Sequence, residues 1–107
     1  MKTLSATELA EWLGDRTREP PLLIDVREPW EHAICRIEGA ELIPMRTVPQ
    51  ATDRIDPSRP IVCICHKGGR SAQVAMFLER NGYSDVTNLT GGIEAWARLV
   101  DPSMAKY

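Results

Sequence analysis

The sequence predicts an α/β fold in three layers, with a mainly parallel sheet of about five strands flanked by helices. Short apolar runs that suit buried strands alternate with segments whose apolar residues recur at helical spacing. The run at 61–65 is continuously apolar, which is typical of a central parallel strand covered on both faces. This alternation implies βαβ units with right-handed crossovers.

The first half of the chain carries the weaker patterns. Ser5 and Glu8 have the spacing of a capping box at the start of a helix, and Pro20-Pro21 stop further helix. The elements expected here are a helix at about 6–13, a strand at 22–26, one or two helical turns at 28–34, an extended segment at 40–43 and a helix at about 47–55.

The second half is more clearly patterned. After the strand at 61–65 and a polar loop, helical spacing begins at Arg70 and ends at Asn81-Gly82, a good C-terminal cap. The elements expected after it are a strand at 86–89, a helix at 93–100 and a loose tail at 101–107.

Length and charge limit the function. The 107 residues make one domain, 1–107, with a core of its own. A formal net charge of −2 argues against a nucleic-acid partner. The first residues lack the apolar segment of a secretory signal, and no apolar run approaches the ~20 residues that cross a bilayer. We therefore expect a cytoplasmic protein without a membrane partner, and a monomer by default.

The three cysteines are Cys35, Cys63 and Cys65, an odd number that suits no disulfide framework. They also lack the paired Cys-x-x-Cys spacing of a zinc site, so no metal is expected. Cysteines in a reducing compartment are buried apolar residues or reactive thiols. We expect Cys63 to be packed and inert and Cys35 to be a passive thiol; the sequence leaves open whether Cys35 is redox-coupled to Cys65.

The segment 65–71, Cys-His-Lys-Gly-Gly-Arg-Ser, carries the chemistry. It follows a strand at the carboxyl edge of the sheet, where ligands of such folds bind. Adjacent glycines allow the loop to turn N–H groups inward into an anion-binding concavity, and the helix start adds further N–H groups. Lys67 and Arg70 add positive charge. These features favour an anionic, nucleophilic sulfur on Cys65 over a cysteine buried only for packing.

Four blocks of the sequence resemble the rhodanese family. The loop 65–70 is similar to its Cys-x-x-x-x-Arg loop, and 23–31 to its first strand and Asp-x-Arg turn. The segment 37–44 resembles its Ile-x-Gly-Ala…Ile-Pro block, and 89–96 its closing Leu-x-Gly-Gly-x-x-Ala-Trp. The blocks come in family order and span roughly residues 5–100.

The resemblance implies a sulfurtransferase that needs no cofactor. Cys65 would be the nucleophile and persulfide carrier, with Lys67 and Arg70 attracting an anionic donor such as thiosulfate. The residues whose backbone would hold the outer sulfur are His66, Lys67, Gly68, Gly69, Arg70 and Ser71. A cysteine desulfurase is the other donor implied, and the acceptors are cyanide, a thiol or a sulfur-carrier protein.

Four further residues are candidates for the rim or support of the site: Asp25, Arg27, Trp30 and Arg36. For Asp25 and Arg27 we favour an ion pair or loop hydrogen bonds that fix the first βα turn over direct substrate contact. Trp30 lines the mouth or lies half-buried on the surface. We favour a solvent-facing His66 over a general base, because an ionised cysteine needs no base.

Two other functions remain as alternatives to sulfur transfer, a phosphatase-like or arsenate-reductase-like enzyme that uses the same thiolate and a non-catalytic module. Phosphatases and arsenate reductases that use a cysteine have a Cys-x-x-x-x-x-Arg loop. In this chain the position of that arginine is occupied by Ser71. A non-catalytic rhodanese-like interaction module is the third hypothesis, and such modules commonly lack the loop cysteine that this chain keeps. The sequence does not distinguish the physiological donor, acceptor or pathway.

Overall fold

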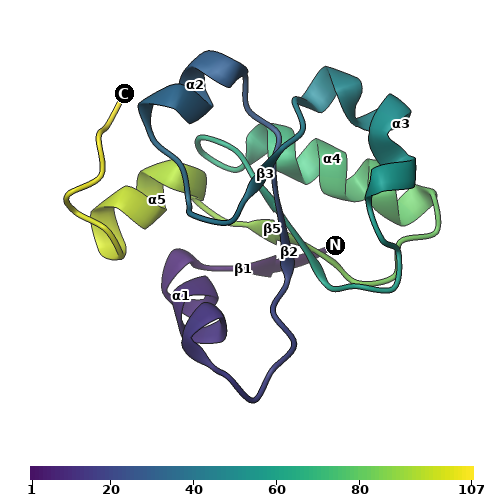
Figure 1. Ribbon diagram of the computed structural model, residues 1–107, viewed down its shortest axis with the longest axis horizontal. Helices are drawn as coiled ribbons and strands as arrows, with labels where there is room; N and C mark the ends of the chain where they lie inside the picture. Colours follow the sequence, from purple (N-terminus) through teal and green to yellow (C-terminus); the bar gives the residue numbers. More distant parts are fainter.

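A five-stranded parallel sheet forms the centre of the structure, a computed structural model that describes residues 1–107 (Figure 1). The strand order is β1-β5-β4-β2-β3, and every neighbouring pair is parallel. The strands are β1 (Lys2–Leu4), β2 (Leu22–Asp25), β3 (Glu41–Leu42), β4 (Ile61–Ile64) and β5 (Val86–Leu89). The structure confirms the predicted fold class.

Helices cover both faces of the sheet: α3 and α4 lie on one side of the strands and α1 on the other (Figure 1). The α-helices are α1 (Ala6–Gly14), α2 (Pro29–Ile34), α3 (Val48–Ala51), α4 (Gly69–Arg80) and α5 (Gly92–Leu99). The helix predicted at 47–55 is instead a series of short turns, Met45–Thr47, α3 and Thr52–Arg54. Pro49 explains the break, because proline fits only the first turn of an α-helix.

Two hydrophobic clusters hold the layers together. Alternate residues of β4 point to opposite faces, as the pleat of a strand requires. Ile61 and Cys63 pack in the cluster that contains Val74 and Leu78 of α4. Val62 and Ile64 pack in the other cluster, with residues of α1 and α5. The central position of β4 therefore fixes the residue that follows it, Cys65, at the carboxyl edge of the sheet.

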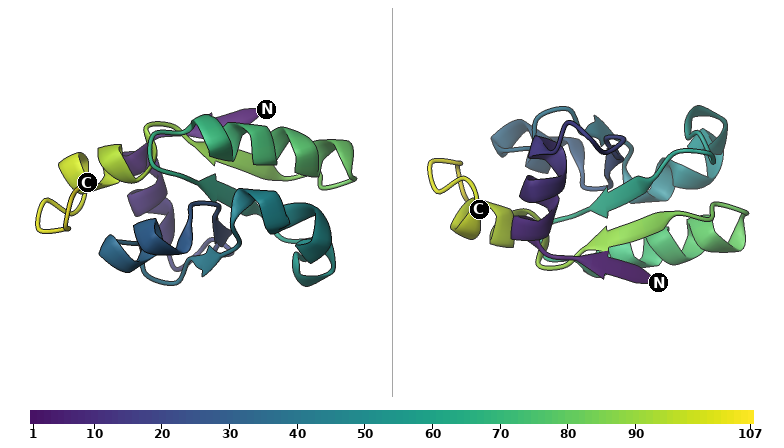
Figure 2. Two further views of the ribbon diagram at one scale, coloured as in Figure 1. Left: turned by 90° about the horizontal axis from the view of Figure 1, so that it is seen from above. Right: turned by 90° about the horizontal axis from the view of Figure 1, so that it is seen from below.

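The segment after α5 turns back beside that helix (Figure 2). The amide of Asp101 donates to the Trp96 carbonyl at 2.9 Å, and the amide of Met104 donates to the Asp101 carbonyl at 3.0 Å. The sequence predicted a loose tail at 101–107. These residues contain no helix or strand, but Tyr107 at their end has fixed contacts with the loop after β4. No helix of the structure is long and apolar enough to span a bilayer.

Candidate active site

The Cys65 sulfur lies inside the turn between β4 and α4. The residue is only 1% exposed. The Gly68 amide donates to Sγ at 3.0 Å, and the Ser71 hydroxyl lies 3.2 Å from the same atom. Gly68 directs its amide inward with a φ of 111°, a backbone angle that favours glycine. The loop therefore presents hydrogen-bond donors to the sulfur from its backbone and from the first turn of α4.

Asn88 of β5 fixes the orientation of Ser71. The Asn88 Nδ2 donates to the Gly68 carbonyl at 3.1 Å, so Oδ1 faces the Ser71 hydroxyl at 2.5 Å. A hydroxyl has one proton. Ser71 can therefore donate to Asn88 while accepting from a Cys65 thiol, or turn its proton to a Cys65 thiolate. Sequence reasoning missed Asn88, although an asparagine inside an apolar strand is unusual and marks a polar partner nearby.

The start of α5 holds the other side of the loop. The amide of Ile93 donates to the Cys65 carbonyl at 2.9 Å, and the amide of Glu94 donates to the His66 carbonyl at 3.0 Å. This approach leaves no room for a side chain at Gly92, where an added Cβ would overlap both carbonyls. Gly92, the first residue of α5, therefore allows the close packing of this helix start against the loop.

Both loop cations are paired with carboxylates. Arg70 donates to the two oxygens of Glu31 at 2.7 and 2.9 Å, and Glu31 is only 3% exposed. Lys67 lies 3.8 Å from Glu94 on the surface. Neither side chain is a free cation beside the sulfur, and the groups that contact the sulfur are the Gly68 amide and the Ser71 hydroxyl.

Glu31 should make the stability of the protein depend on acid pH. The bidentate pair with Arg70 lowers the pKa of Glu31 from about 4.5 to about 2, with further help from the Glu28 amide and the Tyr107 hydroxyl. A lowered folded-state pKa stabilises the protein above the ordinary pKa and loses that effect as pH falls. We expect the free energy of unfolding to fall by about 3 kcal/mol between pH 4.5 and 2 from this group.

Denaturant unfolding of wild type and Glu31→Gln at several pH values in this window measures the effect. Glu31→Gln should be less stable than wild type near neutral pH, and the difference should shrink towards pH 2. Glu94→Gln, which removes only the long surface contact with Lys67, should follow the wild-type curve. Parallel curves for wild type and Glu31→Gln would contradict the role of this pair.

Asp25 and Arg27 form the ion pair that the sequence favoured at the first βα turn. Both side chains are fully buried, and Arg27 donates to the carboxylate of Asp25 through Nε at 2.9 Å and Nη2 at 2.7 Å. Arg27 also donates to the Cys35 carbonyl at 2.7 Å. Although burial acts against the charged form, hydrogen bonds to Asp25 and Tyr107 raise the pKa of Arg27. Their burial places both residues in support of the site.

The two other rim candidates lie on the surface. Trp30 is 60% exposed, and its ring meets the edge of the Tyr107 ring with centroids 5.7 Å apart. Arg36 is exposed and donates to the His32 carbonyl at 3.2 Å. Arg36 borders a separate hollow beside Met104, so the structure places Trp30 closer to the loop than Arg36.

Tyr107 is the second residue that sequence reasoning missed. Its ring stacks on His66 at a centroid distance of 4.1 Å and an interplanar angle of 15°. Its hydroxyl accepts from Arg27 at 2.9 Å and donates to Glu31 at 2.8 Å, which links the two ion pairs around the loop. Burial, with the neighbouring Glu31 carboxylate, raises the pKa of Tyr107 to about 12. No local sequence pattern connects residue 107 with residues 27, 31 and 66.

The other cysteines are buried but differently placed. Burial and the nearby Cys65 raise the pKa of the Cys63 thiol to about 12, which agrees with the expected inert role. Cys35 is also buried, with its sulfur 4.0 Å from Nη1 of Arg27. All three are free thiols in the structure.

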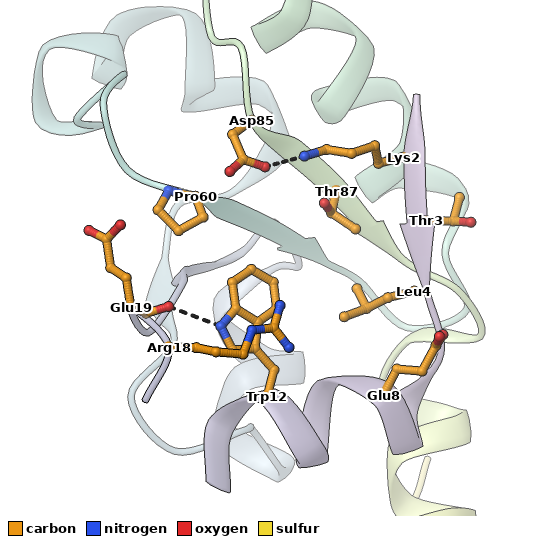
Figure 3. A pocket seen from close by; sticks show the side chains of 10 residues that line it. All are labelled: Lys2, Thr3, Leu4, Glu8, Trp12, Arg18, Glu19, Pro60, Asp85 and Thr87. Carbon is orange, nitrogen blue, oxygen red and sulfur yellow. Dashed lines mark hydrogen bonds and ion pairs between the residues drawn. The ribbon is translucent and has the colours of Figure 1, made fainter. Parts of the chain in front are cut away.

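A different hollow lies far from this loop, beside α1 and the amino ends of β1 and β5 (Figure 3). An ion pair between Lys2 and Asp85 borders it on one side. On the other, the indole of Trp12 donates to the Glu19 carbonyl at 2.9 Å, with Arg18 over its ring. Ligands of parallel α/β sheets bind at the carboxyl ends of the strands. The loop after β4 is therefore the better candidate.

Comparisons with known proteins identify relatives along the whole chain. A family model described as "Rhodanese-like domain" matches residues 5–99. A "Sulfurtransferase" of Allochromatium vinosum is 39% identical over 102 residues, covering 95% of this chain and 94% of that protein. A crystal structure of a rhodanese-like domain protein from Staphylococcus aureus has a TM-score of 0.83 and 36% identity, covering 90% of this chain and 91% of that one.

Other curated relatives are longer. The "Probable adenylyltransferase/sulfurtransferase MoeZ" of Mycobacterium tuberculosis is 38% identical over 107 residues, which cover 98% of this chain but 27% of that protein. The chain thus spans less than a third of the length of several curated relatives that it matches.

Proposed function

The chain belongs to the family of rhodanese-like sulfurtransferases, and from that premise we propose that it transfers sulfane sulfur through a persulfide on Cys65. One observation carries the proposal: the Cys65 sulfur lies at the carboxyl end of β4, with the Gly68 amide at 3.0 Å and the Ser71 hydroxyl at 3.2 Å. Donors in fixed positions around a sulfur stabilise negative charge without reorganisation. These donors suit a Cys65 thiolate, and the loop around them is the proposed site for the outer sulfur of the persulfide.

The proposed reaction has two displacements at sulfur. In the first, the Cys65 thiolate attacks the outer sulfur of a donor such as thiosulfate. A bond forms between the two sulfurs, the bond inside thiosulfate breaks, and sulfite leaves with the electron pair. In the second, an acceptor attacks the outer sulfur of the persulfide, and Cys65 leaves as a thiolate. No proton has to be removed from an ionised cysteine, so the reaction assigns His66 no role as a base.

The names of relatives bear on which molecules donate and accept the sulfur. A "Thiosulfate sulfurtransferase GlpE" of Pseudomonas fluorescens is 31% identical over 75 residues, which supports thiosulfate as the donor. The name of the MoeZ relative pairs sulfurtransferase with adenylyltransferase in one protein and names no acceptor. We therefore propose thiosulfate or a cysteine-desulfurase persulfide as donor, and cyanide, a thiol or a sulfur-carrier protein as acceptor.

The purified protein should form thiocyanate from thiosulfate and cyanide and leave aryl phosphates intact. The physical reason is the loop, which places Arg70 one residue nearer the cysteine than the phosphatase pattern does and leaves less room for a tetrahedral phosphoryl group. Thiocyanate formation and aryl phosphate hydrolysis, measured on one preparation, decide the matter. Hydrolysis without sulfur transfer would favour the phosphatase hypothesis, and neither activity would favour a binding module.

A further inference from the structure

The proposed reaction needs access to a sulfur that is closed off in this structure. Cys65 is 1% exposed. The hollows on the surface are lined by other residues, and the one nearest the loop lies between α5 and residues 105–107. A bulky donor or acceptor must therefore displace some group at the mouth of the loop before it can contact Sγ.

Tyr107 is placed to be that group. Its ring covers His66, the residue directly after Cys65, and its edge meets Trp30. Its hydroxyl bonds to Glu31, which in turn holds Arg70 of the loop through two hydrogen bonds. Tyr107 thus contacts both the loop, through His66, and Glu31, the residue that holds Arg70.

The segment that carries Tyr107 is held more lightly than the sheet. We call residues 101–107 the C-terminal strap. Its backbone is tied by the bonds of Asp101 and Met104, and Met104 is half-buried against the core. Tyr107 is 37% exposed, and no helix or strand continues through the strap. Segments with few buried contacts and little regular structure open at a low free-energy cost.

We infer that Tyr107 is a specificity-determining residue, whose docked ring shields the Cys65 sulfur and selects against bulky thiol reagents and acceptors. Small molecules such as cyanide pass the docked ring, whereas larger ones need the strap to move. The inference rests on the proposed function only where it concerns sulfur acceptors. The shielding itself is a property of the thiol and is measured without any sulfur transfer.

The test compares alkylation of Cys65 by iodoacetamide and by a bulky fluorescein maleimide, with the modified cysteine identified by peptide mapping. Hydrogen bonds to charged groups stabilise the docked strap, so losing those of Tyr107 should raise the population of the open strap about tenfold or more. Tyr107→Ala should therefore raise the maleimide rate at least about tenfold and the iodoacetamide rate much less. Tyr107→Phe keeps the ring but loses both hydroxyl bonds, and it should fall between Tyr107→Ala and wild type.

Lys106→Ala is the matched control, since Lys106 is an exposed strap residue whose ammonium bonds only to the Pro102 carbonyl. Its alkylation rates with both reagents should equal those of wild type. Unchanged maleimide rates in both Tyr107 variants would overturn the inference. Equal acceleration by both reagents would also overturn it, because that pattern reports a change in the thiol itself.

The consequence for catalysis is a change in acceptor preference. Tyr107→Ala should raise kcat/KM for glutathione relative to cyanide, with thiosulfate as donor. An unchanged ratio would contradict the selection of acceptors by Tyr107. If no variant transferred sulfur at all, the proposed function would fail, while the alkylation result would still decide whether the strap shields Cys65.

Discussion

Replacing Cys65 with serine is expected to lower thiocyanate formation by at least about 10³-fold, to the level of the uncatalysed reaction. A serine hydroxyl is a poor nucleophile near neutral pH and cannot form a persulfide. The exchange of sulfur for oxygen is small, and Ser71 and the Gly68 amide can bond to either atom, so the fold should survive. Initial rates with thiosulfate and cyanide, beside thermal unfolding of the same sample, separate lost chemistry from lost structure.

Cys63→Ser is the informative comparison, because Cys63 belongs to the same strand but packs in the sheet. It should keep most of the activity even if it costs some stability. A Cys65→Ser protein that retained wild-type rates, or a Cys63→Ser protein that folded but lost them, would show that the sulfur carrier is misassigned.

Replacing Arg27 with methionine should destabilise the protein by about 3–5 kcal/mol. The side chain is fully buried and pairs with Asp25, which is equally buried, so its loss would leave an uncompensated carboxylate in the core. It would also remove the donor to the Cys35 carbonyl and one of the two hydrogen bonds of the Tyr107 hydroxyl. Denaturant unfolding at neutral pH measures the loss.

Arg46→Ala provides the control for this prediction. Arg46 pairs with Glu28 at 2.7 Å, but its side chain is 68% exposed, and such surface pairs contribute at most about 1 kcal/mol. The double variant Asp25→Leu with Arg27→Met should recover part of the loss, because it removes the buried charge as well. Equal effects of Arg27→Met and Arg46→Ala would contradict the structural importance of the buried pair.

The centre of the fold and the candidate nucleophile can be located in the sequence because their signals are local. The short, continuous apolar run of β4 is typical of a buried strand, and Cys65 follows it directly. The glycines, cations and helix start come within the next few residues. Anion binding by that loop depends on the direction of its backbone N–H groups, and the glycines in the sequence mark where the backbone can turn them inward.

What the sequence does not reveal are contacts between distant segments. β1 has three residues and pairs with β5 at the other end of the chain, so no periodic pattern marks it. The pairing of Arg70 with Glu31 spans 39 residues and that of Tyr107 with Glu31 spans 76. Each contact depends on the folded arrangement of the sheet. The pairing with Glu31 means that Arg70 is not the free cation that its charge suggested in the sequence.

We propose that the Cys65 sulfur, held by the loop after β4, is the atom that carries transferred sulfur. The most direct measurement is intact-mass and fragment-ion analysis of the full chain after incubation with thiosulfate and removal of the excess. We expect one added sulfur atom, located on Cys65 and not on Cys63 or Cys35, that disappears when cyanide is added. An unmodified protein, or an added sulfur located on another cysteine, would contradict it.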